Sequence, residues 1–171
     1  KGLHVPQLKS AHTIDEVLAL SRASYLTQGL ESLRSIPTGS VDFIWSHSVL
    51  EHVRKADFQA VLLELKRILR PGGFASHNID FQDHLAGSLN NLRFSEPVWE
   101  SDFFVRSGFY TNRIPAIRMH ALFAQVGFKV CKEGFGRWEQ LPVRRESLHA
   151  DFQRFADSEL INRTSHVLLS A

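Results

Sequence analysis

The chain has 171 residues, the size of one ordinary domain, and 43% of them are hydrophobic, enough to build a core. Twenty lysine and arginine residues stand against 18 aspartate and glutamate residues, a scattered and small excess that argues against nucleic-acid binding. The single cysteine, Cys131, excludes an intrachain disulfide and a cysteine-based zinc site. No apolar run approaches the roughly 20 residues of a membrane span, and we expect a reducing, cytoplasmic location.

The N-terminal third contains one strong local signal. Lys1–Ser10 shows no periodicity and predicts an irregular segment. Thr13 stands three residues before Glu16, the spacing of a capping box, and predicts a helix that runs to about Arg22. Beyond it we expect a short strand over Ala23–Thr27 and a helical turn over Leu30–Ser35.

The middle of the chain predicts a strand, a helix and a second strand. Val41–Ser46 is an apolar run of strand length, and Lys55–Leu69 carries apolar residues at helical spacing. Pro71–Gly73 is expected to stop that helix, and Phe74–Ile79 to form the next strand. This order predicts a βαβ unit with parallel strands.

The remainder reads as the second half of one domain spanning residues 1–171. Asp80–Pro115 is long for a structureless connection, so it is either an insertion on the substrate side or contains short helices. The later elements are expected to be a helix at Ile117–Val126, a strand at Phe128–Lys132 with Cys131 packed, a loop at Gly134–Arg145, a helix at Ser147–Ala156 and a strand at Thr164–Leu169.

Two stretches carry a family resemblance. Residues 40–53 (SVDFIWSHSVLEHV) and 65–73 (LKRILRPGG) resemble class I S-adenosylmethionine (SAM)-dependent methyltransferases of the type 11-like group. The resemblance implies an α/β, Rossmann-like three-layer fold, S-adenosyl-L-methionine as cofactor and methyl transfer to an acceptor.

The chain departs from that family in its first residues. The family binds SAM on a glycine-rich turn after its first strand, whereas residues 1–24 contain no G-x-G pattern. We therefore expect the C-terminal portion of a methyltransferase domain whose first strands are missing, active as a full-length protein and inactive as this fragment. The strand at Val41–Ser46 would then have an unpaired edge, which predicts self-association.

The cofactor-binding candidates lie where predicted strands end, because ligands of open α/β sheets sit beyond the carboxyl ends of their strands. Ser46 and His47 follow one strand, and the resemblance places them beside the methionine part of SAM. Thr27, Gln28 and Gly29 correspond to the place where the family holds adenine. The alternatives are an exposed loop histidine for His47 and an ordinary turn for residues 27–29.

The catalytic candidates are His84 and Asp80. Methyl transfer requires mainly alignment, and a general base is needed only if the acceptor is protonated. His84 lies in a predicted loop near the strand ends and is preferred as the base. Glu51 and His52 are interpreted as structural residues of a helix start, and His77 as a packed strand residue.

Polar residues of the irregular segment are the substrate-binding candidates: Asn91, Arg93, Tyr110, Asn112 and Arg113. The two arginines could clamp an anionic group of a small-molecule or glycan-like acceptor. Loop capping is the alternative for each of these residues.

Two other functions remain open. His77, Asp80 and His84 could bind the metal of a hydrolase, although His77 and Asp80 should point to opposite faces of their strand. Alternatively, the chain is a non-catalytic methyltransferase-like interaction module.

Overall fold

The computed structural model describes residues 8–171, so most of the predicted irregular segment at Lys1–Ser10 lies outside the described residues. The elements follow one another as η1 (Leu8–Ser10), α1 (Ile14–Ser21), α2 (Leu30–Ser35), β1 (Val41–His47), η2 (Leu50–His52), α3 (Phe58–Ile68), β2 (Leu69–Asp80), η3 (Asn90–Arg93), α4 (Glu96–Trp99), α5 (Asp102–Val105), α6 (Ala116–Gln125), β3 (Lys129–Arg137), η4 (Arg145–Ser147), α7 (Ala150–Gln153), α8 (Asp157–Leu160) and β4 (Asn162–Ser170).

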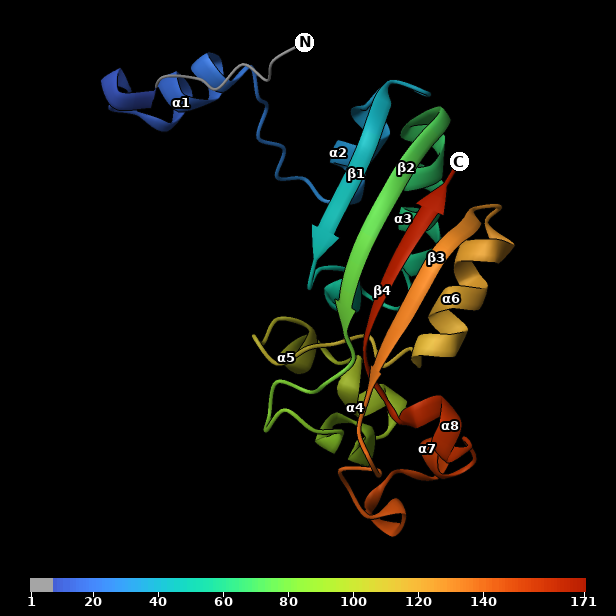
Figure 1. Cartoon of the computed structure of the whole chain (residues 1–171). Helices are drawn as coiled ribbons and strands as arrows, with labels where there is room; N and C mark the ends of the chain where they lie inside the picture. Colours follow the sequence, from blue (N-terminus) through green and yellow to red (C-terminus); the bar gives the residue numbers. More distant parts are fainter. Residues whose placement is uncertain (1–7) are drawn as a thin grey trace.

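The strands form one sheet in the order β1-β2-β4-β3 (Figure 1). β1 and β2 run parallel, with Ser46 opposite His77, which confirms the predicted βαβ unit. β4 runs antiparallel to both β2 and β3. The mixed α/β fold is therefore the one expected.

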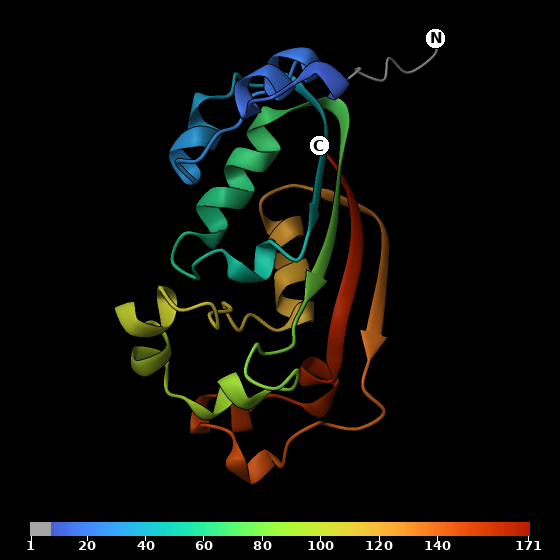
Figure 2. The same ribbon diagram turned by 90° about the vertical axis from the view of Figure 1, so that its left-hand side faces the viewer.

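Helices α2, α3 and α6 cover one face of the sheet, as the side view shows (Figure 2). The main core lies between this helical layer and the inward side chains of the sheet, among them Phe58, Leu62, Phe123 and Val167. Among residues 8–171 no helix covers the other face of the sheet, and Phe43 and Trp45 of β1 are 56% and 67% exposed there.

The short helices lie beyond one end of the sheet, where β1 and β2 have their carboxyl ends (Figure 1). A second hydrophobic cluster joins the Asp80–Pro115 segment to the chain before β4, through Leu89, Leu92, Leu148, Phe152, Phe155 and Leu160. The segment contains short helices, which was one of the two alternatives left open by its sequence. It lies at the end of the sheet where ligands of open α/β folds are expected.

Some sequence-based predictions were wrong. Residues 23–27 form no strand, since no neighbouring strand lies beside them to pair with their backbone. Pro71–Gly73 belong to the irregular start of β2, where Gly72 takes a positive φ of 74° and a side chain at Gly73 would crowd two carbonyl oxygens. Cys131 lies in β3 but is exposed rather than packed.

Candidate functional site

The carboxyl end of β1 brings Ser46 against His77 of β2. The Ser46 hydroxyl lies 2.7 Å from Nδ1 of His77, whose side chain is 1% exposed and stacks on Phe123. Burial lowers the pKa of His77 to about 4, so the ring is neutral at physiological pH. The burial of this ring and its stack on Phe123 confirm the prediction of a packed histidine, and its Nε2 has no hydrogen-bond partner.

A groove of about 410 Å³ opens beside this pair, between β1, α2, η2 and α3. Its walls are mainly apolar, and its polar lining includes Ser46, His77, Arg54 and Asp57. The volume falls in the range of about 300–1,000 Å³ that is typical of small-ligand sites. We refer to this cavity as the β1 groove.

Two of the five predicted cofactor residues, Gly29 and Ser46, line the β1 groove. His47 follows Ser46 in the strand and therefore lies on the opposite, uncovered face, where Nδ2 of Asn78 lies 3.4 Å from its Nδ1. Thr27 and Gln28 are exposed and bond locally, with the Gln28 backbone N–H donating to Oγ of Ser32. The structure thus separates these residues, which the resemblance had grouped.

Glu51 is a buried carboxylate at this end of the sheet. It is 2% exposed, and its Oε1 accepts a 3.2 Å hydrogen bond from the backbone N–H of Asp80 while Oε2 has no partner. Burial raises the pKa of Glu51, because the charged form loses hydration that one hydrogen bond does not replace. From the sequence, Glu51 is interpreted as a structural residue. A structural role does not require a buried carboxylate oxygen that lacks a hydrogen-bond partner.

The two catalytic candidates occupy different positions at the rim. The Asp80 carboxylate accepts hydrogen bonds from the backbone and side chain of Gln82, at 2.9 and 3.1 Å. His84 is exposed, and its ring centroid lies 4.9 Å from that of His52. Because Nδ1 of His52 lies 2.8 Å from the carbonyl oxygen of Tyr110, which can only accept, that nitrogen carries the proton and Nε2 is the basic nitrogen of the neutral ring.

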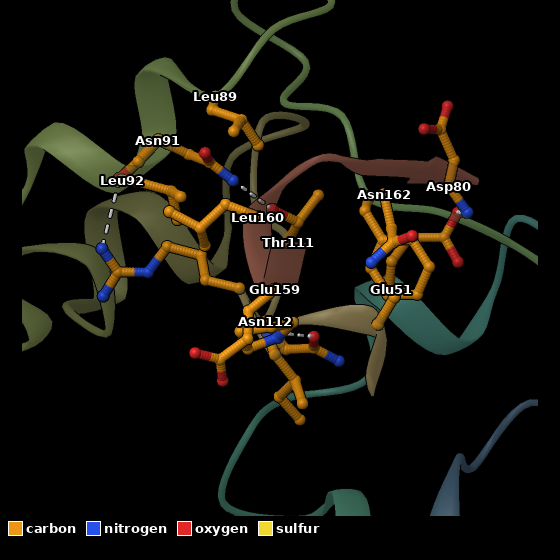
Figure 3. Close-up of a pocket in the computed structure, with 15 residues that line it drawn as sticks. Glu51, Asp80, Leu89, Asn91, Leu92, Thr111, Asn112, Glu159, Leu160 and Asn162 are labelled. Atoms are coloured by element: carbon orange, nitrogen blue, oxygen red, sulfur yellow. Dashed lines mark hydrogen bonds between the residues drawn. The ribbon is translucent and has the colours of Figure 1, made fainter. Parts of the chain in front are cut away.

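Four of the five predicted substrate-binding residues, namely Asn91, Tyr110, Asn112 and Arg113, are buried. The fifth, Arg93, is exposed. Asn91 donates a hydrogen bond to Thr111 at 2.9 Å (Figure 3). Asn112 donates to the carbonyl oxygens of Leu50 and Val53. The contacts of Asn112 join the irregular segment to the turn that follows β1.

Tyr110 and Arg113 are held by the protein itself. The Tyr110 hydroxyl accepts from the Lys55 backbone N–H at 3.1 Å and donates to the Glu100 carboxylate, and burial raises its pKa to about 12. Arg113, with a side chain 0% exposed, donates to the carbonyl oxygen of Phe94 at 2.8 Å and to Glu96 at 2.6 Å. The cavity that Figure 3 shows around Glu51, Asn91 and Asn112 has a volume of about 30 Å³, room for little more than water.

Residues 8–171 offer no set of metal ligands for the hydrolase alternative. Among residues 8–171 there is no group of three or more His, Cys, Asp or Glu side chains that could hold a metal ion. In the same part of the chain, no helix combines the length and apolarity needed to cross a membrane.

Comparison with known proteins agrees with this geometry. The profile of the methyltransferase domain family matches residues 5–76, and no curated protein matches the sequence. Among solved structures, a SAM-dependent methyltransferase from Methanosarcina mazei is 13% identical with a TM-score of 0.56, over 86% of this chain and 66% of that one. One from Mesorhizobium loti is 12% identical with a TM-score of 0.53, over 92% and 76%.

The same fold also occurs in the [4+2]-cyclase SpnF, which is 13% identical with a TM-score of 0.52, over 91% of this chain and 58% of that one. The chain therefore spans less than two thirds of the length of some of the solved proteins that it matches. At these identities the structures show the fold alone, and the family profile adds the sequence match. Together they show that this chain matches the methyltransferase domain profile over residues 5–76 and shares the fold of SAM-dependent methyltransferases.

Proposed function

We propose that the protein, as a full-length chain, transfers a methyl group from SAM to a small-molecule or glycan-like acceptor. The observation that carries the proposal is the β1 groove, a mainly apolar cavity of about 410 Å³ at the carboxyl end of β1 with Ser46 in its wall. Open α/β sheets bind their ligands in this position. The family profile over residues 5–76 supports the same chemistry.

The residues of the groove fit the nucleoside part of the cofactor. Apolar side chains such as Leu30 and Val49 suit a flat base, and Ser46 and Asp57 offer hydrogen-bonding oxygens for a sugar. When bound, SAM supplies an activated methyl group on a sulfonium. What the chain must add is alignment of the acceptor and exclusion of water.

We propose His84 as the general base for a protonated acceptor, with Asp80 at the same rim. His84 is exposed at the carboxyl end of β2 and lies beside His52, whose basic Nε2 also faces no partner within the described residues. An imidazole nitrogen at this rim can accept a proton from a bound acceptor.

Binding of S-adenosylhomocysteine, measured by titration calorimetry, tests the proposal. We expect micromolar binding by the full-length protein and weak binding by the 171-residue chain, which lacks a glycine-rich loop in residues 1–24. Val49→Trp fills the groove and should weaken binding by about tenfold or more. Val98→Trp is the matched control, because Val98 is 46% exposed, close to the 49% of Val49, and lies outside the groove.

Two results would contradict this function. Equal binding by the Val49→Trp and Val98→Trp variants would place the cofactor outside the β1 groove. Absence of binding by the full-length protein would favour the non-catalytic interaction module. A cytoplasmic location and self-association through β1 remain predictions, the first tested by cell fractionation.

A further inference from the structure

A second cavity of about 310 Å³ lies beyond the irregular segment, and we call it the basic pocket. Four separate parts of the chain build it: the approach to α3, the irregular segment, the start of α6 and the α7 region. The cations in its lining are Lys55, Arg113, Arg118 and Arg154, and the carboxylates are Glu96 and Asp151.

The ion pairs of the basic pocket leave positive charge in excess. Glu96 is the only carboxylate that pairs with either Lys55 or Arg113 in the described part of the chain, so one negative charge serves two cations. Arg154 is exposed and forms no ion pair within residues 8–171, whereas Arg118 pairs with Glu159 at 3.3 Å. Asp151, whose carboxylate lies 3.2 Å from Nδ1 of His149, adds one negative charge to the lining, so the four cations still outnumber the carboxylates.

Arg113 provides a buried donor that nothing in the chain uses. Its side chain is 0% exposed and it lines the basic pocket, yet Nε has no hydrogen-bond partner. Burying an unpaired donor destabilises a protein unless a ligand or water accepts from it. Burial also lowers the pKa of Arg113, while the nearby carboxylates of Glu96 and Glu100 act in the opposite direction.

The amino end of α6 adds partial positive charge at the same place. Pro115 is its N-cap and makes no side-chain cap, and the first turn of this ten-residue helix carries no acidic residue. Pro115 and Arg118 line the pocket. The free N–H groups and the dipole of such a helix end favour an anion.

Two phenylalanine rings complete the walls. The Arg118 guanidinium lies 4.1 Å from the ring centre of Phe155, and the Arg113 guanidinium lies 4.9 Å from that of Phe152. Cations stacked on aromatic faces hold their positions while their remaining N–H groups stay available.

We propose that the basic pocket binds the anionic group, a carboxylate or a phosphate, of an acceptor that also carries an apolar body. Calling this ligand the methyl acceptor rests on the proposed function, whereas anion binding itself does not. Carboxylate and phosphate share the chemistry of recognition by paired guanidinium groups, and the rings of Phe152 and Phe155 suit the apolar part.

Phenyl phosphate, benzoate and benzylamine are the probes, titrated into the wild-type chain and followed by calorimetry. We expect saturable binding of at least one anion, weakened by added salt, and none of benzylamine. Arg154→Ala should weaken anion binding by about tenfold or more, and Asp151→Asn should strengthen it by about threefold. Arg106→Ala removes the same charge from an exposed position outside the pocket and should change nothing.

The outcomes separate this proposal from the cofactor proposal. Preference for phenyl phosphate or for benzoate assigns the anion, and either result supports the site. No saturable binding of either anion, or equal losses in the Arg154→Ala and Arg106→Ala variants, overturns it. S-adenosylhomocysteine binding is measured separately from anion binding. Loss of one kind of binding with retention of the other therefore shows which proposal has failed.

Discussion

Replacing His77 by phenylalanine should remove a large part of the acid sensitivity of this fold. Burial lowers the pKa of His77 from the ordinary 6.5 to about 4. Between these values the unfolded chain binds a proton that the native chain does not, so stability is full above pH 6.5 and falls as the pH drops toward 4. One pKa unit corresponds to about 1.4 kcal/mol, and the total loss is therefore about 3 kcal/mol.

Phenylalanine keeps the ring that stacks on Phe123, at a centroid distance of 6.1 Å, and removes both the titrating group and the unpartnered Nε2. Urea unfolding measured from about pH 7 to about pH 4.5 gives the comparison, with the free energy of unfolding plotted against pH. The wild-type curve should fall more steeply than that of His77→Phe. His166→Phe, which removes an exposed histidine of β4, is the control and should retain the wild-type slope.

The difference between the pH curves of the wild type and His77→Phe reports on His77 alone, because the other titratable groups are the same in these two chains. Burial raises the pKa of Glu51, so its protonation favours the native state as the pH falls, opposite in sign to His77. Parallel pH curves for the wild type and His77→Phe would refute the reasoning. They would mean that His77 is hydrated or finds a partner for Nε2 in solution.

Three further expectations follow from single contacts. Arg113→Met should lower the free energy of unfolding by about 2–4 kcal/mol, because it removes bonds to two carbonyl oxygens and to Glu96; a loss below about 1 kcal/mol in urea unfolding would show that these bonds are weak. Glu51→Gln should raise the melting temperature at neutral pH, measured by calorimetry, since it removes a buried charge that lacks a partner for Oε2. If two copies pair antiparallel through β1 about the middle of the strand, Phe43 of one copy lies opposite Trp45 of the other. Light scattering should then show a weaker dimer for Phe43→Lys or Trp45→Glu alone and a restored dimer for the double variant. A wild type that is monomeric at all concentrations argues against this pairing.

Local signals in the sequence were read correctly. The capping box of Thr13 and Glu16 forms as expected, because both partners lie within one turn of helix. The strand at Val41–Ser46 and the following helix were also correct, since apolar periodicity records which side of an element faces the core.

The errors arose where distant parts of the chain decide the structure. Gly134 and Gly136 favoured a loop, yet both lie in β3, where a side chain at Gly136 would collide with Thr164 of the neighbouring strand. Residues 23–27 have the composition of a strand, but a strand requires a partner. Single-sequence periodicity contains neither piece of information.

The site residues divide in the same way. Ser46 was found because strand ends can be located from the sequence. Arg118 and Arg154 carried no signal, since they come from separate helices and only the packing of Phe155 between them brings both to one cavity. Cation clusters of this kind are visible only in three dimensions.

Asn112 and Arg113, both predicted from the sequence to bind substrate, also make contacts within the protein that shape the two cavities. Asn112 donates to the carbonyl oxygens of Leu50 and Val53, and both of those residues line the β1 groove. Arg113 follows it with a positive φ of 57° and enters the basic pocket. One pair of neighbouring residues therefore holds the walls of both cavities, so a substitution at Asn112 that reduced activity would not identify a substrate contact unless the shape of the β1 groove were shown to be unchanged.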